Sequence, residues 1–175
     1  DDVLGLQTEI VHDKVIAFGG SVRKSMGEGF LISFPSTVAA VSAAAAIERA
    51  FHEYNIANPQ RTVEIRIGLH VGEVAERDGD LLGQAVHVAA RILAEAAGGQ
   101  ILTSDDVRKH AEPQVDWSFL DSGLYWLRGF PERWRRYEVA WSDTPVGVVR
   151  ASTLPARLTP GVEREAERAS LRRLP

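Results

Sequence analysis

A hairpin signal near the N-terminus constrains the fold most. Two β-like runs, 21–26 and 30–34, flank the turn Gly27-Glu28-Gly29. Short runs of this kind on either side of a glycine-rich turn predict an antiparallel hairpin, because glycine tolerates the backbone angles of tight turns. A helix is expected before it, over 3–18, where apolar residues recur at helical spacing and Gly19-Gly20 follows. A helix followed by a hairpin favours an architecture of mixed α and β elements.

The remaining elements alternate. The alternating apolar pattern of Val63–Val74 predicts a strand of a half-buried sheet, and a polar turn is expected at 76–80. The other expected elements are helices over 36–54, 84–97 and from Ser104 to about 110, and strands over 100–103, 117–127 and 137–141. Helices alternating with strands and hairpins predict an α/β fold, here a mixed α+β sandwich.

Bulk composition excludes several classes. The 175 residues, 45% of them hydrophobic, suit one compact domain with a tail. The net charge of −4 argues against nucleic-acid binding through a basic surface. There is no cysteine, which excludes disulfides and suits the cytoplasm, where we expect the protein to reside. No apolar run approaches the roughly 18 residues of a membrane span. The chain begins at Asp1 and its only methionine is Met26, so we expect it to be part of a longer protein.

Several ordered sequence blocks point to one family. They are 20–34, 66–73, 79–91, 98–104 and 127–129 before 137–139. In this order and spacing, the chain resembles the catalytic domain of class III nucleotide cyclases, the adenylate and guanylate cyclases. The resemblance covers about 3–141 and implies a ferredoxin-like sheet backed by helices, in a head-to-tail homodimer with active sites at the subunit interface. The family's first strand would precede Asp1, so the expected fold lacks that strand.

Two residues are expected to read the base. Lys24 can only donate hydrogen bonds through its ammonium, whereas ionised Asp80 can only accept them. Adenine offers an acceptor at N1 beside a donor at its amino group, and guanine presents the opposite pattern. By resemblance, Lys24 and Asp80 are the base-selecting positions and predict ATP rather than GTP. Taken singly, each is an ordinary strand lysine or turn aspartate.

One helix is expected to carry the catalytic side chains. Arg91 follows His87 by four residues, so the two share a helix face, with Val86, Ala89, Ala90 and Leu93 expected on the buried side. The resemblance assigns Arg91 to the charge that develops on the α-phosphate. It places His87 where the family usually has an asparagine that orients the ribose. The alternative is a solvated stripe with an Arg91–Glu95 ion pair.

The triphosphate and its metal ions have expected partners too. The resemblance gives Arg128 to the triphosphate, although a loop arginine without a function is nearly as good an interpretation. It gives Glu28 to Mg²⁺ or Mn²⁺, two ions being expected in an intact site. The family usually has aspartate there; glutamate moves the carboxylate by roughly an ångström, whereas metal–ligand distances are held within about 0.2 Å. The family's second metal aspartate would lie on the strand before Asp1.

The C-terminal part is expected to lie outside the catalytic domain. We expect residues 1–141 to form that domain and residues 142–160, which contain three prolines, to be a linker. Residues 161–175 resemble the start of a signalling ATPase module.

The leading interpretation is a class III adenylate cyclase that converts ATP to cyclic AMP and pyrophosphate in intracellular signalling, with weak or no turnover in this fragment. The alternative is a degenerate cyclase-homology domain that binds nucleotide or dimerises and regulates an attached ATPase. The Gly-Gly-Asp-Glu-Phe run of diguanylate cyclases is absent from the chain.

Overall fold

A computed structural model describes residues 2–27 and 29–142. Its helices are α1 (Asp2–Ala17), α2 (Thr37–Ala57), α3 (Gln84–Glu95), α4 (Asp105–Ala111) and the short 3-10 helix η1 (Glu112–Gln114). Its strands are β1 (Ser21–Met26), β2 (Gly29–Ser33), β3 (Arg66–Leu69), β4 (Ala75–Arg77), β5 (Asp80–Leu82), β6 (Gln100–Ser104), β7 (Phe119–Trp126) and β8 (Arg133–Val139).

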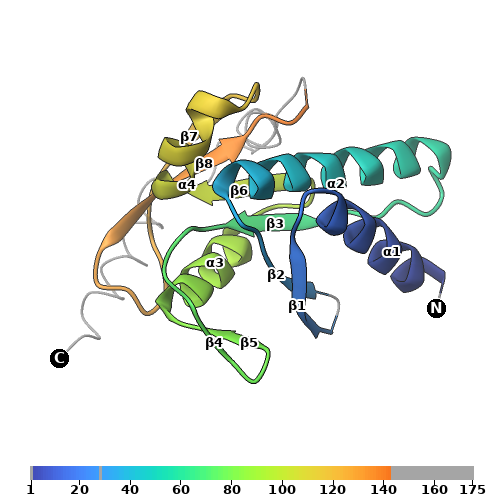
Figure 1. Cartoon of the computed structure of the whole chain (residues 1–175). Coiled ribbons are helices and arrows are strands. Elements are labelled where there is room, and N and C mark those ends of the chain that lie inside the picture. Colours follow the sequence, from blue (N-terminus) through green and yellow to red (C-terminus); the bar gives the residue numbers. More distant parts are fainter. Residues whose placement is uncertain (1, 28, 143–175) are drawn as a thin grey trace.

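The strands form one larger sheet and two hairpins. The larger sheet has the order β3-β6-β8-β7, in which β3 and β6 are parallel and the other neighbours are antiparallel. The strands β1 and β2 form the first hairpin, and β4 and β5 form the second. The helices α2 and α3 lie on opposite sides of the larger sheet (Figure 1). This arrangement confirms the mixed α/β sandwich predicted from the sequence.

Neighbouring residues of β6 show how the sheet serves two cores. Ile101 packs with α2 and α4, including Val41 and Val107, whereas Leu102 packs with Val88 of α3. Successive side chains of a strand point to opposite faces, so one apolar strand supplies both layers. The strand is buried along its whole length.

A third core joins the β1–β2 hairpin to the rest of the molecule. It contains Val15 of α1, Phe51 of α2, Ile32 of β2 and, next to β3, Ile65. Among the described strands, β2 pairs only with β1 and β3 only with β6. The hairpin and the larger sheet therefore share apolar packing without a hydrogen-bonded ladder between them.

Helix α2 also carries Glu48, whose side chain is buried with 3% exposed.

Three expected elements differ from the structure. Burial alternates from Val63 to Ile67 as predicted, but the strand is shorter than 63–74. The backbone N–H and C=O of Val63 bond to the side chain of Asn55, at 2.7 and 2.8 Å, instead of a neighbouring strand. The expected polar turn at 76–80 belongs to a second hairpin, in which Arg77 pairs with Asp80. Asp78 and Gly79 form its two-residue loop, and both have the positive φ that a type I′ turn requires. Strand β8 begins at Arg133 instead of 137 because it pairs with β7 along its length.

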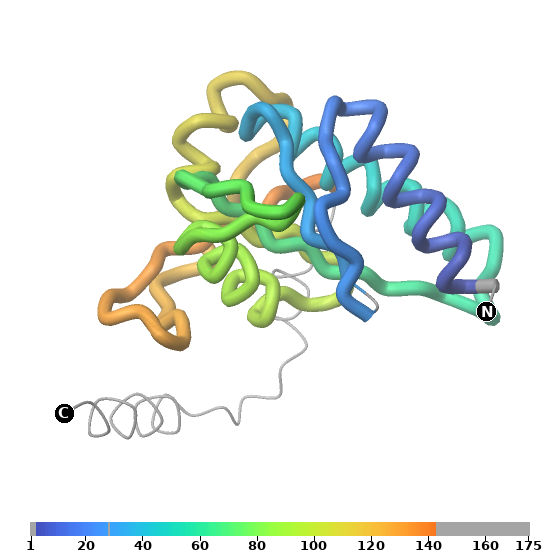
Figure 2. Tube along the Cα trace, turned by 60° about the horizontal axis from the view of Figure 1, so that its bottom comes forward, coloured from blue at the N-terminus to red at the C-terminus, as the bar shows by residue number. Residues whose placement is uncertain are grey.

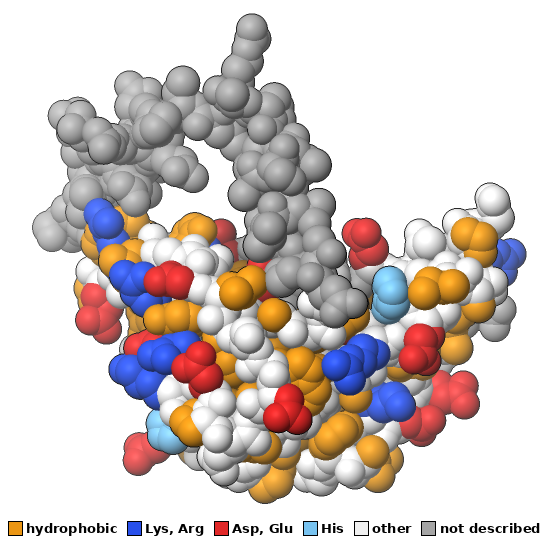
Figure 3. All heavy atoms as spheres, turned by 90° about the horizontal axis from the view of Figure 1, so that it is seen from above, with side chains coloured by type: hydrophobic (Ala, Val, Ile, Leu, Met, Phe, Trp, Pro, Cys, Tyr) orange, Lys and Arg blue, Asp and Glu red, His pale blue; other side chains and the backbone are white. Residues whose placement is uncertain are grey.

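The predicted linker beyond Ser142 and the predicted module at 161–175 lie outside the described residues. No helix of the described part is both long and apolar enough to cross a bilayer. Acidic and basic side chains are interspersed on the face seen from above (Figure 3).

Candidate nucleotide site

The two residues expected to read the base are in contact. Lys24 on β1 places its Nζ 3.1 Å from Oδ2 of Asp80 on β5, although 56 positions separate them in the sequence. Both side chains are partly open to solvent, 51% exposed for Lys24 and 39% for Asp80. The two hairpins that carry them lie side by side (Figure 2). A donor-only group and an acceptor-only group are thus brought to one accessible point of the surface.

The β4–β5 hairpin fixes Asp80 at its start. Asp80 is the first residue of β5 and pairs with Arg77 across the turn. Its second carboxylate oxygen, Oδ1, accepts a hydrogen bond from the backbone N–H of Leu81 at 3.0 Å. One oxygen is therefore held by the backbone while the other faces Lys24.

A short connection links this hairpin to α3. Gly83, with φ of 136°, is the N-cap of the helix and separates it from β5. Helix α3 also lies very close to β3, because a Cβ on Gly68 would come within 2.5 Å of the backbone nitrogen of Leu93. Only glycine fits at that approach. The position of α3 is thus set by a tight connection on one side and by close backbone contact on the other.

The two catalytic candidates of α3 have free side chains. His87 is exposed and Arg91 is half-buried, and neither makes a hydrogen bond or ion pair within residues 2–27 and 29–142. Oε2 of Glu95 lies 3.8 Å from Nη1 of Arg136. The alternative of an Arg91–Glu95 ion pair is not formed among the described residues. An arginine without a protein partner keeps its guanidinium donors available for an anion.

The buried face of α3 was predicted only in part. Val88 and Ile92 are the buried residues of the helix. Ala89 lies against Gly68, as expected, but Ala90 is exposed, so the prediction was wrong there. The helix contacts two surfaces, the β3 backbone at Gly68 and the apolar cluster that contains Leu102 of β6 and Trp134 of β8, so its buried residues do not follow a single stripe.

Arg128 occupies a turn packed against the same helix. Its neighbour Leu127 is 2% exposed and belongs to the cluster that includes Val88 and Ile92 of α3. The N–H of Phe130 donates to the Leu127 carbonyl at 3.0 Å, and Gly129 has a φ of 90°, which closes a β-turn with Arg128 at its exposed tip. The fold thereby places Arg128 on a turn anchored to the helix of His87 and Arg91.

The predicted metal ligand, Glu28, lies outside the described residues. Within those residues, no group of three or more histidine, aspartate or glutamate side chains is arranged to hold a metal ion.

Sequence reasoning missed a second ion pair beside the first. Arg23 on β1 places its Nη1 3.2 Å from Oε2 of Glu76 on β4, and its Nε donates to the Ser33 hydroxyl at 2.8 Å. Like Lys24 and Asp80, this pair joins the two hairpins. No local signal in the sequence indicates it, because the partners are distant along the chain.

A cleft of about 430 Å³ lies next to the start of α3. Its walls come from the segment after β3, the first turns of α3 and Trp134. His70 lines it, and its Nδ1 lies 2.7 Å from the Ser104 hydroxyl. Burial lowers the pKa of His70, and the nearby Asp106 carboxylate partly opposes that effect. None of the five candidate residues that the structure describes lines this cleft.

Comparison with known proteins gives the family. No protein-family model matches the sequence. A crystal structure described as an adenylate/guanylate cyclase/hydrolase from Silicibacter pomeroyi is 31% identical, with a TM-score of 0.73, over 79% of this chain and 85% of that chain. The adenylyl cyclase CyaB from P. aeruginosa shares the fold, with a TM-score of 0.68 and 20% identity over 83% of each chain.

A curated relative points the same way. A Rhizobium meliloti protein named as a candidate adenylate cyclase is 36% identical over 118 residues, 67% of this chain. The alignment spans 20% of the length of that relative, so this chain matches only a part of it. The fold and these similarities together define a nucleotide cyclase domain. The chain belongs to the class III adenylate/guanylate cyclase family.

Proposed function

We propose that this domain is an adenylate cyclase, which converts ATP to cyclic AMP and pyrophosphate and acts as a homodimer. The observation that carries the proposal is the contact of Lys24 with Asp80 at 3.1 Å. The adenine edge needs one donor and one acceptor side by side, and the hairpins present that combination. Guanine would place its N1 donor against the Lys24 ammonium, which is also a donor. It would place its O6 acceptor against the Asp80 carboxylate, which is also an acceptor.

The ion pair must open for a base to bind. Both side chains are partly exposed, and an exposed ion pair contributes only about 0–1 kcal/mol, so its rearrangement costs little. Lys24 would then donate to adenine N1, and Asp80 would accept from the exocyclic amino group. Oδ1 of Asp80 keeps its bond from Leu81 during this change, which leaves Oδ2 free for the base.

The chemistry joins two atoms of the same substrate. The ribose 3′-oxygen attacks the α-phosphorus, the bond from that phosphorus to the bridging oxygen breaks, and pyrophosphate leaves with that electron pair while the 3′-hydroxyl proton is released. Arg91 would stabilise the negative charge that develops on the α-phosphate, and Arg128 would bind the departing phosphates. His87 would hold the ribose, as a donor or an acceptor. Positioning and charge stabilisation carry such reactions.

The homodimer would complete the site. In this proposal Lys24, Asp80, His87 and Arg91 of one subunit face Glu28 of the partner subunit. Mg²⁺ or Mn²⁺ bound there would neutralise the triphosphate and activate the attacking oxygen. Activity would then depend on protein concentration, because a monomer holds only part of each site.

A regulatory, non-catalytic domain is the second candidate. It is favoured by His87, which replaces the asparagine typical of the family, and by Glu28, which replaces an aspartate. Such a domain would bind nucleotide or dimerise and regulate an attached ATPase module, without forming product.

One experiment separates the two candidates. Cyclic AMP is measured with ATP and Mn²⁺ for residues 1–175 and for the parent protein that contains them, together with ATP binding by calorimetry. The catalytic proposal expects product from the parent dimer and little or none from residues 1–175. ATP binding by the parent without product would support the regulatory candidate, and absence of ATP binding would refute both nucleotide-binding proposals.

A further inference from the structure

Strand β1 contains a bulge at Arg23. Val22 lies opposite Ile32 and Lys24 lies opposite Leu31, so Arg23 is an extra residue without a partner position on β2. Ile32 and Leu31 are neighbours, and neighbouring side chains of a strand point to opposite faces. Val22 therefore points into the core shared with α1 and α2, where Ile32 also packs, while Lys24 lies on the other face.

The bulge decides where the Lys24 ammonium lies. In a regular strand, residues two positions apart share a face, so Lys24 would point into the apolar core together with Val22. An ammonium in such a core is costly unless it is paired. The single extra residue moves Lys24 to the face on which Asp80 lies, as bulges commonly do when they redirect side chains.

The side chain of Arg23 makes two contacts outside its own strand. It donates from Nε to Ser33 on β2 and pairs through Nη1 with Glu76 on β4, so it connects three strands. Its side chain is 28% exposed, against 51% for Lys24. Glu76 and Asp80 lie on the two strands of the β4–β5 hairpin, so the two ion pairs hold both of its strands against β1.

We propose that Arg23 is a positioning residue that fixes the bulge of β1 against the β4–β5 hairpin and so sets the contact between Lys24 and Asp80. The consequence for base selection rests on the proposed adenylate cyclase function. The geometric claim does not, because it concerns side chains that are in contact without nucleotide. A ligand-independent measurement therefore decides the geometric claim by itself.

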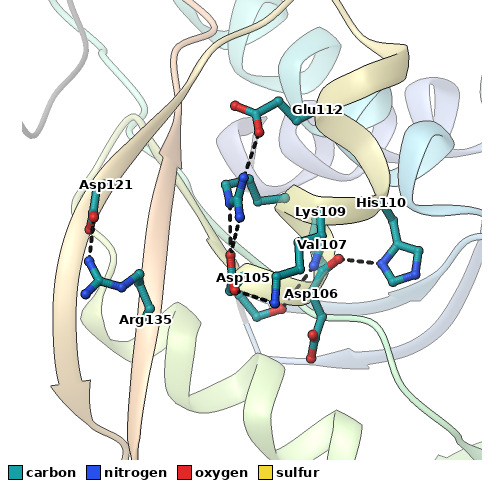
Figure 4. Close-up of polar contacts among 10 residues, drawn as sticks. Asp105, Asp106, Val107, Lys109, His110, Glu112, Asp121 and Arg135 are labelled. Carbon is teal, nitrogen blue, oxygen red and sulfur yellow. Dashed lines mark hydrogen bonds and ion pairs between the residues drawn. The ribbon is translucent and has the colours of Figure 1, made fainter.

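Zero-length carbodiimide crosslinking measures the contact directly. The reagent takes up the elements of water as an amide forms between a carboxylate and a lysine amine in contact, and a guanidinium does not react. The yield of the Lys24–Asp80 crosslink reports the contact. The Lys109–Asp105 crosslink is the internal standard, because these side chains lie 2.8 Å apart within α4, far from the bulge in sequence (Figure 4). Peptide mass spectrometry gives the ratio of the two crosslinks in the full 175-residue chain.

Charge reversal and charge exchange provide matched variants. Arg23→Glu sets a carboxylate against Glu76, and we expect the crosslink ratio to fall several-fold. The exchange Arg23→Glu with Glu76→Arg should restore most of it, and Arg23→Gln should lie between, because it keeps a donor for Ser33 only. An unchanged ratio in Arg23→Glu, or no recovery in the exchange, would overturn the proposal. A ratio that falls and recovers supports it.

Nucleotide binding tests the consequence in the same variants. If the wild type prefers ATP to GTP, Arg23→Glu should narrow that preference several-fold and the exchange should recover it, with thermal unfolding of both variants close to that of the wild type. A preference that stays constant while the crosslink ratio falls would overturn the functional part. If the wild type binds neither nucleotide, the adenylate cyclase proposal fails, and the crosslink ratio still decides whether Arg23 positions Lys24.

Discussion

Replacing Glu48 by glutamine should change how stability depends on pH. Glu48 lies on α2 with 3% of its surface exposed, and within the described residues its Oε1 has no hydrogen-bond partner. Burial, followed by the negative charge of Glu64, raises the pKa of Glu48 from 4.5 to about 8. The folded protein therefore holds this carboxyl protonated under conditions in which the unfolded chain has released the proton.

The sign and size follow from proton linkage. A pKa that is higher in the folded state stabilises the fold fully below the unfolded value of 4.5, and this contribution is lost as the pH rises through about 8. One pKa unit corresponds to about 1.4 kcal/mol, so the full shift sets an upper limit of roughly 5 kcal/mol. Water entry and local relaxation reduce such values, and we expect roughly 2–4 kcal/mol to be measured.

Urea unfolding of the wild type and Glu48→Gln, at about pH 4 and about pH 8.5, provides the assay. Glutamine is neutral at both values, so the variant should match the wild type at the lower pH and be more stable at the higher one. Glu64→Gln is the matched control and should give a smaller gain, because it removes only the neighbouring charge. Parallel pH dependence of the wild type and Glu48→Gln would refute the reasoning.

Three other sets of substitutions test the described contacts. Replacing Lys24 or Asp80 by alanine should relax the preference for ATP over GTP by about tenfold, measured by competition binding, since one good hydrogen-bonding contact is worth about 1–3 kcal/mol; an unchanged ratio would count against base reading. Gly68→Ala should destabilise the fold by roughly 1–3 kcal/mol in urea unfolding because its Cβ meets the α3 backbone, whereas Gly5→Ala, with open space around its Cβ position, should not. Ser104→Ala should cost about 1 kcal/mol because Ser104 caps α4 and contacts His70; equal stability to the wild type would contradict this role.

Much of the architecture could be predicted because it depends on local signals. The β1–β2 hairpin follows from its turn residues, and the alanine-rich helix α2 follows from its apolar periodicity. The start of α4 follows from the capping residue Ser104. The Asp78-Gly79 pair also marks a two-residue hairpin loop, so the β4–β5 hairpin has a local signal that goes beyond the predicted polar turn.

The rest depends on contacts between distant segments. The rotation of the α3 buried face toward Val88 and Ile92 follows from two surfaces that meet the helix. The bulge at Arg23 follows from register, which alternation alone does not show. The candidate residues Lys24 and Asp80 are identified from resemblance, whereas their contact across two hairpins is visible only in the fold.

The β1–β2 hairpin and the larger sheet pack on a common apolar core, but among the described residues no backbone hydrogen bonds join β2 to β3. The outer edges of β2 and β3 carry backbone donors and acceptors that no described strand takes up, and such edges can recruit strands of other molecules. Self-association through these edges would produce dimers or larger aggregates that have nothing to do with catalysis. A sedimentation result for residues 1–175 therefore has to be read together with the effect of a proline placed in β2, which removes a backbone donor from that edge while the edge of β3 stays open.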